Sequence, residues 1–207
     1  MFQKPVIQAF IAQAHKRSYP PKHTIIHPGD APASLFLILE GSVSILLEDP
    51  NGREIVLAYL NPGEFFGEMC LFPDQGVRTA IVRTRTQSTL VAETTYPIFR
   101  QFAAAHHEIM YEIAGQLAAR LRNTSQRLGD LAFLDVAGRM ARVLLDMSGK
   151  PGALPHASGR MVRVSRQELA RNAGCSREMA GRVLKKLEED GLVLCQGRNI
   201  VVLNTPR

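Results

Sequence analysis

Short apolar stretches separated by turn residues dominate the first half of the chain, after one helix-like segment. Residues 6–14 have the apolar spacing of a short amphipathic helix. Between about residues 19 and 94, apolar runs recur at intervals of about 10–12 residues, with glycine- or proline-containing turns between them. This spacing is typical of an antiparallel sandwich or barrel. The strands predicted from it are 24–27, 35–40, 42–48, 54–60, 80–84 and 88–94.

A long helix follows over residues 107–135, and its apolar positions recur in a heptad pattern. This heptad seam consists of Met110, Ala114, Leu117, Leu121, Thr124, Leu128 and Leu131. A two-position seam is narrower than the stripe that packs a helix onto its own domain, so it favours two chains paired along this helix. A monomer whose helix packs on its barrel is the alternative. Thr124, with Ser125 beside it, is a polar seam residue that sets register or contacts a ligand.

The pattern changes again beyond residue 133, where strands and short helices alternate. The sequence predicts a hinge at 134–136, a helix at 136–147, a loop at 151–160 and a strand at 161–164. Ser165 is a candidate helix N-cap, and Glu168 would complete a capping box with it. A new helical segment therefore begins directly after the predicted strand.

The segment from Arg166 to Lys185 has the pattern of two short helices joined at Gly174, where a tight turn favours glycine. The second helix is predicted to end at Gly191, and 192–195 and 199–203 then form a β-hairpin. A helix-turn-helix followed by such a hairpin is a winged helix, whose second helix can enter the DNA major groove. An ordinary helix pair with a solvated charged face is the alternative.

The distribution of charge favours the DNA-binding interpretation. The chain has a net charge of +6. Residues 136–207 hold 13 Lys or Arg and 6 Asp or Glu, whereas residues 1–135 hold 12 and 13. A basic last third joined to a nearly neutral first part suits a separate nucleic-acid module, because phosphate neutralisation supplies most non-specific affinity.

The segment from Gly63 to Phe72 is the main candidate for chemistry in the first part of the chain. Gly67 can expose backbone N–H groups, and the carboxylate of Glu68 lies next to it. Arg78 and Thr79 follow with a positive charge and a hydroxyl. Arginine with free N–H groups can hold a phosphate, and a carboxylate can accept from a ribose hydroxyl. The residues suggest a nucleotide, and a surface turn with an ion pair is the alternative.

Other classes of function find little support. Cys70, Cys175 and Cys195 are widely spaced and odd in number, which predicts neither a disulfide framework nor a metal knuckle. No catalytic metal cluster or nucleophile–base pair is recognisable, so we expect no enzyme and no bound metal. No apolar run approaches the roughly 18 residues of a membrane span, and no signal peptide is evident. We therefore expect a cytoplasmic protein.

Three segments carry a family resemblance. GEFFGEMCLF with VRTA resembles the phosphate-binding cassette of the cyclic AMP receptor protein (catabolite activator) family of bacterial transcription regulators. LAFLDVAGRMARVLLDM and VSRQELARNAGCSREMAGRVLKKLEEDGLV resemble its hinge helix and helix-turn-helix. The resemblance implies an α+β fold with an antiparallel β-roll at 1–105, a dimerisation helix and hinge at 106–135, and a winged helix at 136–207. It covers about Tyr19 to Arg207.

The resemblance also implies a function and its residues: a homodimer that binds double-stranded DNA in response to cyclic AMP. The implied cyclic-nucleotide ligands are Gly67, Glu68, Met69, Cys70, Arg78, Thr79, Thr124 and Ser125. The implied DNA-binding residues are Arg166, Gln167, Ser176, Arg177, Glu178, Arg182 and Lys185. Of these, Arg177, Glu178 and Arg182 match base-reading residues, and the chemistry agrees, because Arg suits guanine and Glu accepts from cytosine. Residues 153–161 match a surface that contacts RNA polymerase.

Some positions depart from the family pattern. Cys70 replaces a usual glycine, and Thr79 replaces a serine but keeps its hydroxyl. Pro97 and Ile98 stand where lysines are frequent on a second polymerase-contact surface. Some relatives answer to cyclic di-GMP, and residues 83–87 resemble them, so this effector is the alternative. A cyclic-nucleotide-binding module without DNA function is a further competitor.

Overall fold

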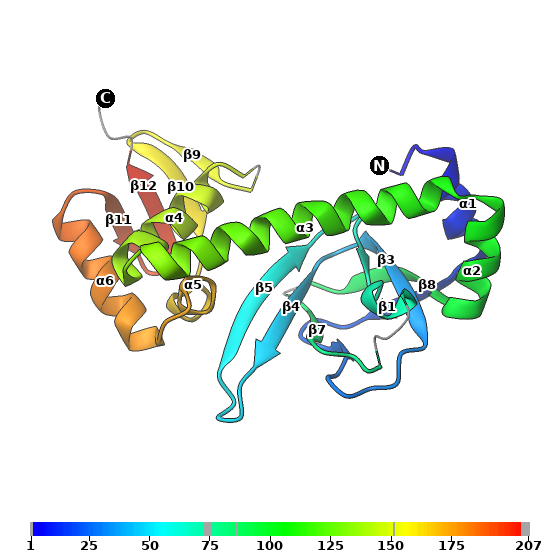
Figure 1. The fold of residues 1–207 in the computed structure, drawn as a ribbon. Coiled ribbons are helices and arrows are strands. Elements are labelled where there is room, and N and C mark those ends of the chain that lie inside the picture. Colours follow the sequence, from blue (N-terminus) through cyan, green and yellow to red (C-terminus); the bar gives the residue numbers. More distant parts are fainter. Residues whose placement is uncertain (1, 73–75, 86, 151, 204–207) are drawn as a thin grey trace. The chain divides into compact units, whose positions relative to one another are not determined.

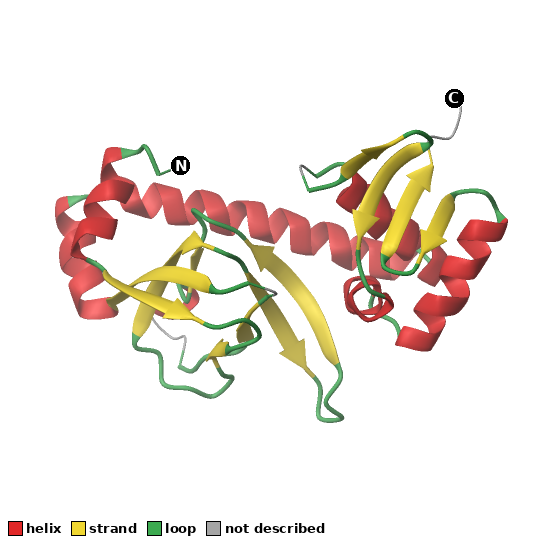
Figure 2. Cartoon of the chain, turned by 180° about the vertical axis from the view of Figure 1, so that it is seen from behind, coloured by secondary structure: helices red, strands yellow, loops and turns green. Residues whose placement is uncertain are grey.

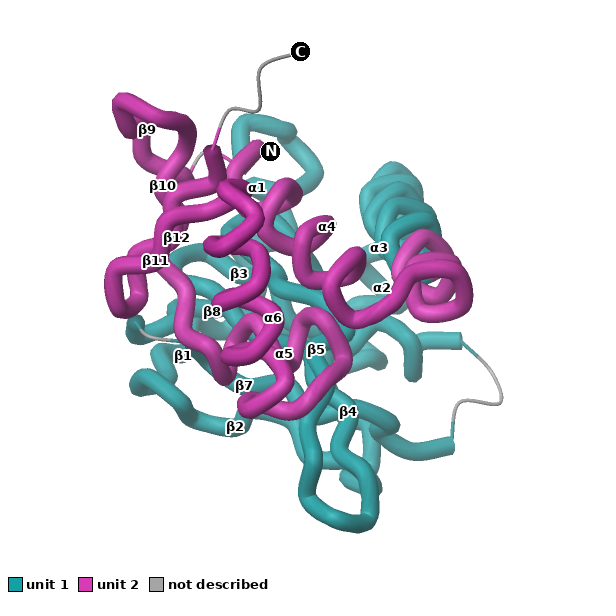
Figure 3. Tube along the Cα trace, turned by 90° about the vertical axis from the view of Figure 1, so that its left-hand side faces the viewer, with its two compact units in different colours: residues 1–124 teal, residues 125–207 magenta. Residues whose placement is uncertain are grey.

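The computed structural model describes residues 2–72, 76–85, 87–150 and 152–203 and divides the chain into two compact units (Figure 3). Unit 1 comprises Met1–Thr124 and unit 2 comprises Ser125–Arg207. Thr86 and Pro151, which fall within predicted segments, lie outside the described residues. The α+β class predicted from the sequence is confirmed, with antiparallel sheets, a long helix and a helical C-terminal part.

Unit 1 contains two four-stranded antiparallel sheets, ordered β1-β8-β3-β6 and β2-β7-β4-β5 (Figure 1). The strands are β1 His15–Tyr19, β2 Thr24–Ile26, β3 Ser34–Glu40, β4 Val43–Glu48, β5 Glu54–Leu60, β6 Phe65–Phe66, β7 Ile81–Thr84 and β8 Thr89–Thr95. The six predicted strands are confirmed. The sequence pattern missed β1, which is almost entirely exposed and polar, and β6, which is only two residues long.

Three helices close one end of unit 1, where α1 and α2 lie beside the beginning of α3 (Figures 1 and 2). They are α1 Pro5–Gln13, α2 Tyr96–Ala105 and α3 Glu108–Phe133. Phe10 of α1 makes edge contacts with the rings of Phe65, Phe99 and Phe102, at centroid distances of 5.3, 6.2 and 6.0 Å. The aromatic cluster therefore joins two helices to the short strand β6, and it fixes the strand that leads into Gly67.

The heptad seam of α3 divides into two parts in the structure. Met110 and Leu117 are partly buried against the core of unit 1, beside the fully buried Ile109 and Ile113. Leu121 and Leu128 are instead 68% and 67% exposed. The sequence pattern favoured pairing with a partner chain along the whole seam. This prediction was incomplete, because Met110 and Leu117 pack on their own unit.

Unit 2 places three helices against one sheet of order β11-β12-β10-β9 (Figure 2). Its elements are α4 Val136–Ser148, β9 Leu154–His156, β10 Gly159–Arg163, α5 Arg166–Ala173, α6 Arg177–Glu189, β11 Val193–Gln196 and β12 Asn199–Leu203. The break before α4 falls at Asp135, whose side chain caps the helix by accepting from the Gly138 N–H. The predicted hinge therefore coincides with a helix boundary.

The loop predicted at 151–160 is corrected by the structure. Leu154–His156 form strand β9, which pairs with β10 and is exposed along its length. A three-residue strand with a central proline and no buried face carries no apolar alternation, so the pattern could not reveal it.

A continuous apolar core supports unit 2. Met140 and Leu144 of α4 are buried with Leu169 of α5 and Ala180 and Leu184 of α6. Apolar residues of all three helices thus form this core, and the charged residues of α6 remain on the surface. Among the described residues, no helix is both long and apolar enough to cross a membrane.

We expect Phe10→Ala to lower the free energy of unfolding by about 3–5 kcal/mol, because it leaves a cavity among three aromatic rings. Tyr111→Ala is the matched control, because Tyr111 is 76% exposed on α3. Its effect should stay within about 0.5 kcal/mol. Urea denaturation at equal protein concentrations measures both variants, and equal losses of stability would contradict the assignment of Phe10 to the core.

Candidate ligand pocket and nucleic-acid interface

Gly67 lies where β6 turns into the short helix η1 Met69–Leu71, and only glycine suits this position. Its φ is 80°, in the region that side chains disfavour. A Cβ atom there would also lie 3.0 Å from Arg78 Nη1 and 3.0 Å from the Ser34 carbonyl oxygen. The backbone of the loop can therefore approach the guanidinium closely.

Arg78 is buried, with 7% of its surface exposed. Its Nη1 donates to the Gly67 carbonyl at 2.9 Å, and its Nη2 donates to the Ser34 carbonyl at 2.6 Å. The Tyr96 hydroxyl also donates to the Gly67 carbonyl at 2.7 Å, and the Arg78 guanidinium lies 5.6 Å from the Tyr96 ring centre. Burial raises the pKa of Tyr96 to about 12, so the hydroxyl remains a hydrogen-bond donor even in alkaline solution.

Glu68 is 5% exposed and forms an ion pair with Arg120 of α3, at 2.6 Å between Arg120 Nη1 and Glu68 Oε1. Arg120 also donates to the Phe65 carbonyl. Removing one member of a buried ion pair leaves the other charge buried without a partner, which strongly destabilises the folded protein. Glu68 and Arg120 are therefore interdependent.

Arg120, Tyr96 and Ser34 were not predicted as site residues from the sequence pattern. They are distant along the chain from Gly67 and join it only through the packing of α2, α3 and β3. One signal was present for Arg120, because it precedes Thr124 by four residues and therefore lies on the same face of the helix. We call Gly67, Glu68, Arg78, Tyr96 and Arg120 the Gly67 cluster.

The other predicted ligand residues have different surroundings. Met69 is 53% exposed, Thr79 is exposed, and Cys70 is partly buried with its Sγ 3.8 Å from the Val77 carbonyl oxygen. Thr124 and Ser125 are both exposed on α3. The structure therefore buries Glu68 and Arg78 beside the partly buried Gly67, and it leaves the hydroxyls predicted to contact a ligand accessible.

The Gly67 cluster has the chemistry to bind an anion that carries hydroxyl groups. A guanidinium has five N–H donors, enough to hold two carbonyls and a phosphate oxygen at once. The carboxylate of Glu68 can accept from a ligand hydroxyl. Among the residues that the structure describes, no group of three or more His, Cys, Asp or Glu side chains could hold a metal ion.

In unit 2, α5 and α6 form a helix-turn-helix whose turns match the sequence prediction. Ser165 and Ser176 cap the two helices, accepting from the Glu168 and Met179 N–H groups at 3.1 Å each. Gly174 ends α5 in the left-handed conformation, with φ 63°. Glu188 then accepts from the Cys195 N–H at 2.7 Å and ties the end of α6 to the wing strand β11.

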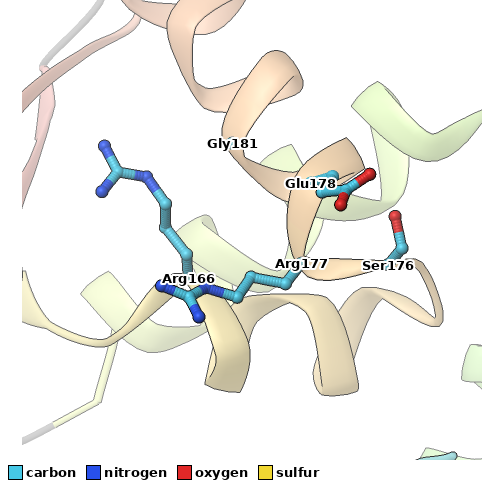
Figure 4. A pocket seen from close by; sticks show the side chains of 5 residues that line it. All are labelled: Arg166, Ser176, Arg177, Glu178 and Gly181. Atoms are coloured by element: carbon cyan, nitrogen blue, oxygen red, sulfur yellow. The ribbon is translucent and has the colours of Figure 1, made fainter.

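The outer face of the helix pair presents the predicted DNA-binding residues to solvent. All seven are exposed: Arg166, Gln167, Ser176, Arg177, Glu178, Arg182 and Lys185. Four of them, with Gly181, line an open hollow of about 560 Å³. Figure 4 shows Arg166 and Arg177, from the starts of α5 and α6, on one side of α6, and Glu178 and Ser176 on the other. This face combines excess positive charge with one carboxylate.

Comparisons with known proteins agree with both parts of the chain. Residues 16–106 match the cyclic nucleotide-binding domain, and residues 138–207 match the Crp-like helix-turn-helix domain. The cAMP-activated global transcriptional regulator Vfr of Pseudomonas aeruginosa is 48% identical over 202 residues, covering 96% of this chain and 94% of Vfr. The cAMP-activated global transcriptional regulator CRP of Salmonella typhimurium is 42% identical over 201 residues, covering 97% and 95%.

A solved structure is also similar to this chain along nearly its whole length. The c-di-GMP-responsive global regulator CLP of Xanthomonas campestris is 45% identical, with a TM-score of 0.90, and the match covers 97% of this chain and 99% of that chain. The relatives named here are transcription regulators, and the two domains occur in the expected order. The chain therefore belongs to the cyclic AMP receptor protein (CRP) family of DNA-binding transcription regulators.

Proposed function

We propose that cyclic AMP is the allosteric effector of this regulator and binds at the Gly67 cluster. The observation that carries the proposal is the buried guanidinium of Arg78, which the Gly67 and Ser34 carbonyls hold in place. The cyclic phosphate would bind Arg78 and Thr79, with the Met69–Cys70 backbone beside it. Glu68 would accept from the ribose 2′-hydroxyl.

The same proposal places the adenine against α3. Thr124 follows Arg120 by one helical turn on the same face, and both Thr124 and Ser125 are exposed. Their hydroxyls can hydrogen-bond the adenine amino group, with Ser125 supplied by the partner chain. Cyclic AMP would then bridge the pocket of one chain and the helix of the other.

We propose further that the protein acts as a homodimer paired along the second part of the heptad seam. Leu121, Leu128 and Leu131 are 68%, 67% and 53% exposed in the single chain. Apolar residues repeated at heptad spacing along one helix are stabilised when a second copy covers them. Pairing would also place two recognition helices on successive major grooves, one DNA turn apart.

Cyclic di-GMP is the second candidate effector. The observation that favours it is the likeness to the c-di-GMP-responsive regulator CLP, at 45% identity and a TM-score of 0.90. The likeness to the cAMP-activated Vfr is of similar strength, at 48% identity. The retained Arg78 and Thr79, followed on α3 by Thr124 and Ser125, favour the smaller cyclic AMP.

Proposals for RNA polymerase contact rest on the outer strands of unit 2. Residues 153–161 include strand β9, whose Leu154 is 56% exposed. An exposed edge strand with an apolar side chain is suited to a protein partner. In unit 1, Lys16 and Arg17 supply positive charge on the exposed strand β1. Pro97 and Ile98, on α2, supply none where the family often has lysines.

Calorimetric titration of the purified protein with cyclic AMP and, separately, with cyclic di-GMP tests the effector. We expect cyclic AMP to bind and to increase the affinity of the protein for its operator, because a ligand that prefers one of two states shifts the equilibrium toward it. Binding of cyclic di-GMP alone would establish the second candidate. Bound cyclic AMP with no change in DNA affinity would refute the proposed switch.

Arg78→Gln should weaken cyclic AMP binding by roughly 10–100-fold, because it removes a charge-assisted bond to phosphate. Arg53→Gln is the matched control, because the Arg53 side chain is 78% exposed at the β4–β5 turn. It should leave the dissociation constant unchanged. Thermal unfolding of both variants without nucleotide separates lost binding from lost folding, and equal affinity of both variants would exclude Arg78 from the site.

Glu178→Ala should reduce discrimination at one cytosine by about 1–3 kcal/mol, because the carboxylate can accept from the cytosine amino group. Lys185→Ala should instead weaken binding to all sequences and lower the salt slope by about one. Operator variants measured by fluorescence anisotropy at several salt concentrations distinguish these effects. A uniform loss in Glu178→Ala would show that this residue reads no base.

A further inference from the structure

Gln116 of α3 completes the hydrogen bonding of the short strand that precedes Gly67. Its Oε1 accepts from the Phe65 N–H at 2.8 Å, and its Nε2 donates to the Gly63 carbonyl at 3.1 Å. Strand β6 is an edge strand, paired on one side with β3 through Phe36–Phe66 and Leu37–Phe65. The side-chain amide therefore binds the outer edge of β6 as the peptide group of a neighbouring strand would.

The contact continues from Gln116 to the candidate pocket. Arg120, one turn along α3, donates to the Phe65 carbonyl and to Glu68, and its Nη2 lies 3.4 Å from Gln116 Oε1. Two side chains of one helix thus hold the backbone at Gly63 and Phe65 and the carboxylate of Glu68. Any shift of this segment must be followed by α3 or must break these bonds.

Gln116 differs from Arg120 in what it touches. The hydrogen bonds of Gln116 described above reach the backbone of residues 63 and 65 and the Arg120 guanidinium, whereas Arg120 also reaches Glu68, a proposed ligand residue. The segment itself is firmly held on its other side, because the Gly63 N–H donates to the Ile38 carbonyl and the Ile38 N–H donates to the Glu64 carbonyl. Gln116 is therefore placed to transmit the position of the segment rather than to contact a ligand.

We propose that Gln116 is a positioning residue that couples nucleotide occupancy at the Gly67 cluster to the placement of α3, and so to DNA affinity. This inference rests on the proposed function. Nucleotide contacts at Gly67 and Glu68 favour one position of residues 63–68. The amide of Gln116 fixes α3 to that position, and α3 carries the exposed seam residues Leu121 and Leu128. Coupling of this kind requires that nucleotide binding and DNA binding both favour the same position of α3.

The test replaces Gln116 with methionine, which keeps the length of the side chain and removes the hydrogen bonds of the amide to the Phe65 N–H, the Gly63 carbonyl and the Arg120 guanidinium. The measured quantity is the ratio of operator dissociation constants without and with saturating cyclic AMP. We expect Gln116→Met to lower this ratio by up to about tenfold, which corresponds to the loss of one or two hydrogen bonds. Cyclic AMP affinity of the DNA-free protein should change by less than about threefold, because the amide does not touch the ligand.

Two further variants control the interpretation. Gln101→Met changes an exposed glutamine on α2 and should leave the ratio unchanged. Gln116→Glu keeps an acceptor for the Phe65 N–H but loses the donor to Gly63, so its ratio should fall between those of the wild type and Gln116→Met. A ratio in Gln116→Met equal to that of the wild type would overturn the proposal. An equal loss of free-protein cyclic AMP affinity would also overturn it, by showing that Gln116 only supports the pocket.

Hydrogen exchange separates failure of this inference from failure of the proposed function, because it needs no DNA. In the wild type we expect cyclic AMP to alter amide exchange in α3, and in Gln116→Met this change should disappear while exchange at Phe65 becomes faster. If that result accompanies no effect of cyclic AMP on DNA affinity, the link from the Gly67 cluster through Gln116 to α3 stands, whereas the link from α3 to DNA affinity and the proposed regulatory function both fail. No change in α3 exchange in the wild type would refute the inference itself.

Discussion

The burial of two opposite charges beside one glycine is the constraint on which the candidate site depends. Arg78 and Glu68 are almost completely removed from solvent, and each would be costly to bury without partners. The partners are the Gly67 and Ser34 carbonyls for Arg78 and the guanidinium of Arg120 for Glu68. Strands β3 and β6 and helix α3 must therefore meet at one place.

Helix α3 connects this constraint to the rest of the chain. Its first turns are buried in unit 1 through Ile109 and Ile113, and its polar residues Gln116 and Arg120 bind the segment before and after β6. Beyond these, the apolar side chains of Leu121 and Leu128 are exposed. Successive sections of one helix thus pack in the core of unit 1, hydrogen-bond to residues 63–68, and expose apolar side chains that a second chain can cover. A regulator needs such an element, because a signal must change something that two sites share.

Prediction from sequence succeeded where the physical rule is local. The Ser165 cap, the left-handed Gly174 and the exposed charged face of α6 all follow from residues within one or two helical turns. The same holds for the six apolar strands of unit 1. It failed where local pattern is weak: β1 is polar and exposed, β6 is two residues long, and β9 contains a proline and has no buried face.

The sequence by itself determined the order of the two domains, the helix-turn-helix with its wing, and the residue types able to bind a phosphate and read bases. These properties depend on short-range periodicity, turn chemistry and side-chain chemistry. Only the tertiary structure decided that Glu68 pairs with Arg120, that Gln116 binds the edge of β6, and that Met110 and Leu117 pack on their own unit. These contacts join residues far apart in the chain, and no local pattern encodes which distant groups packing will bring together.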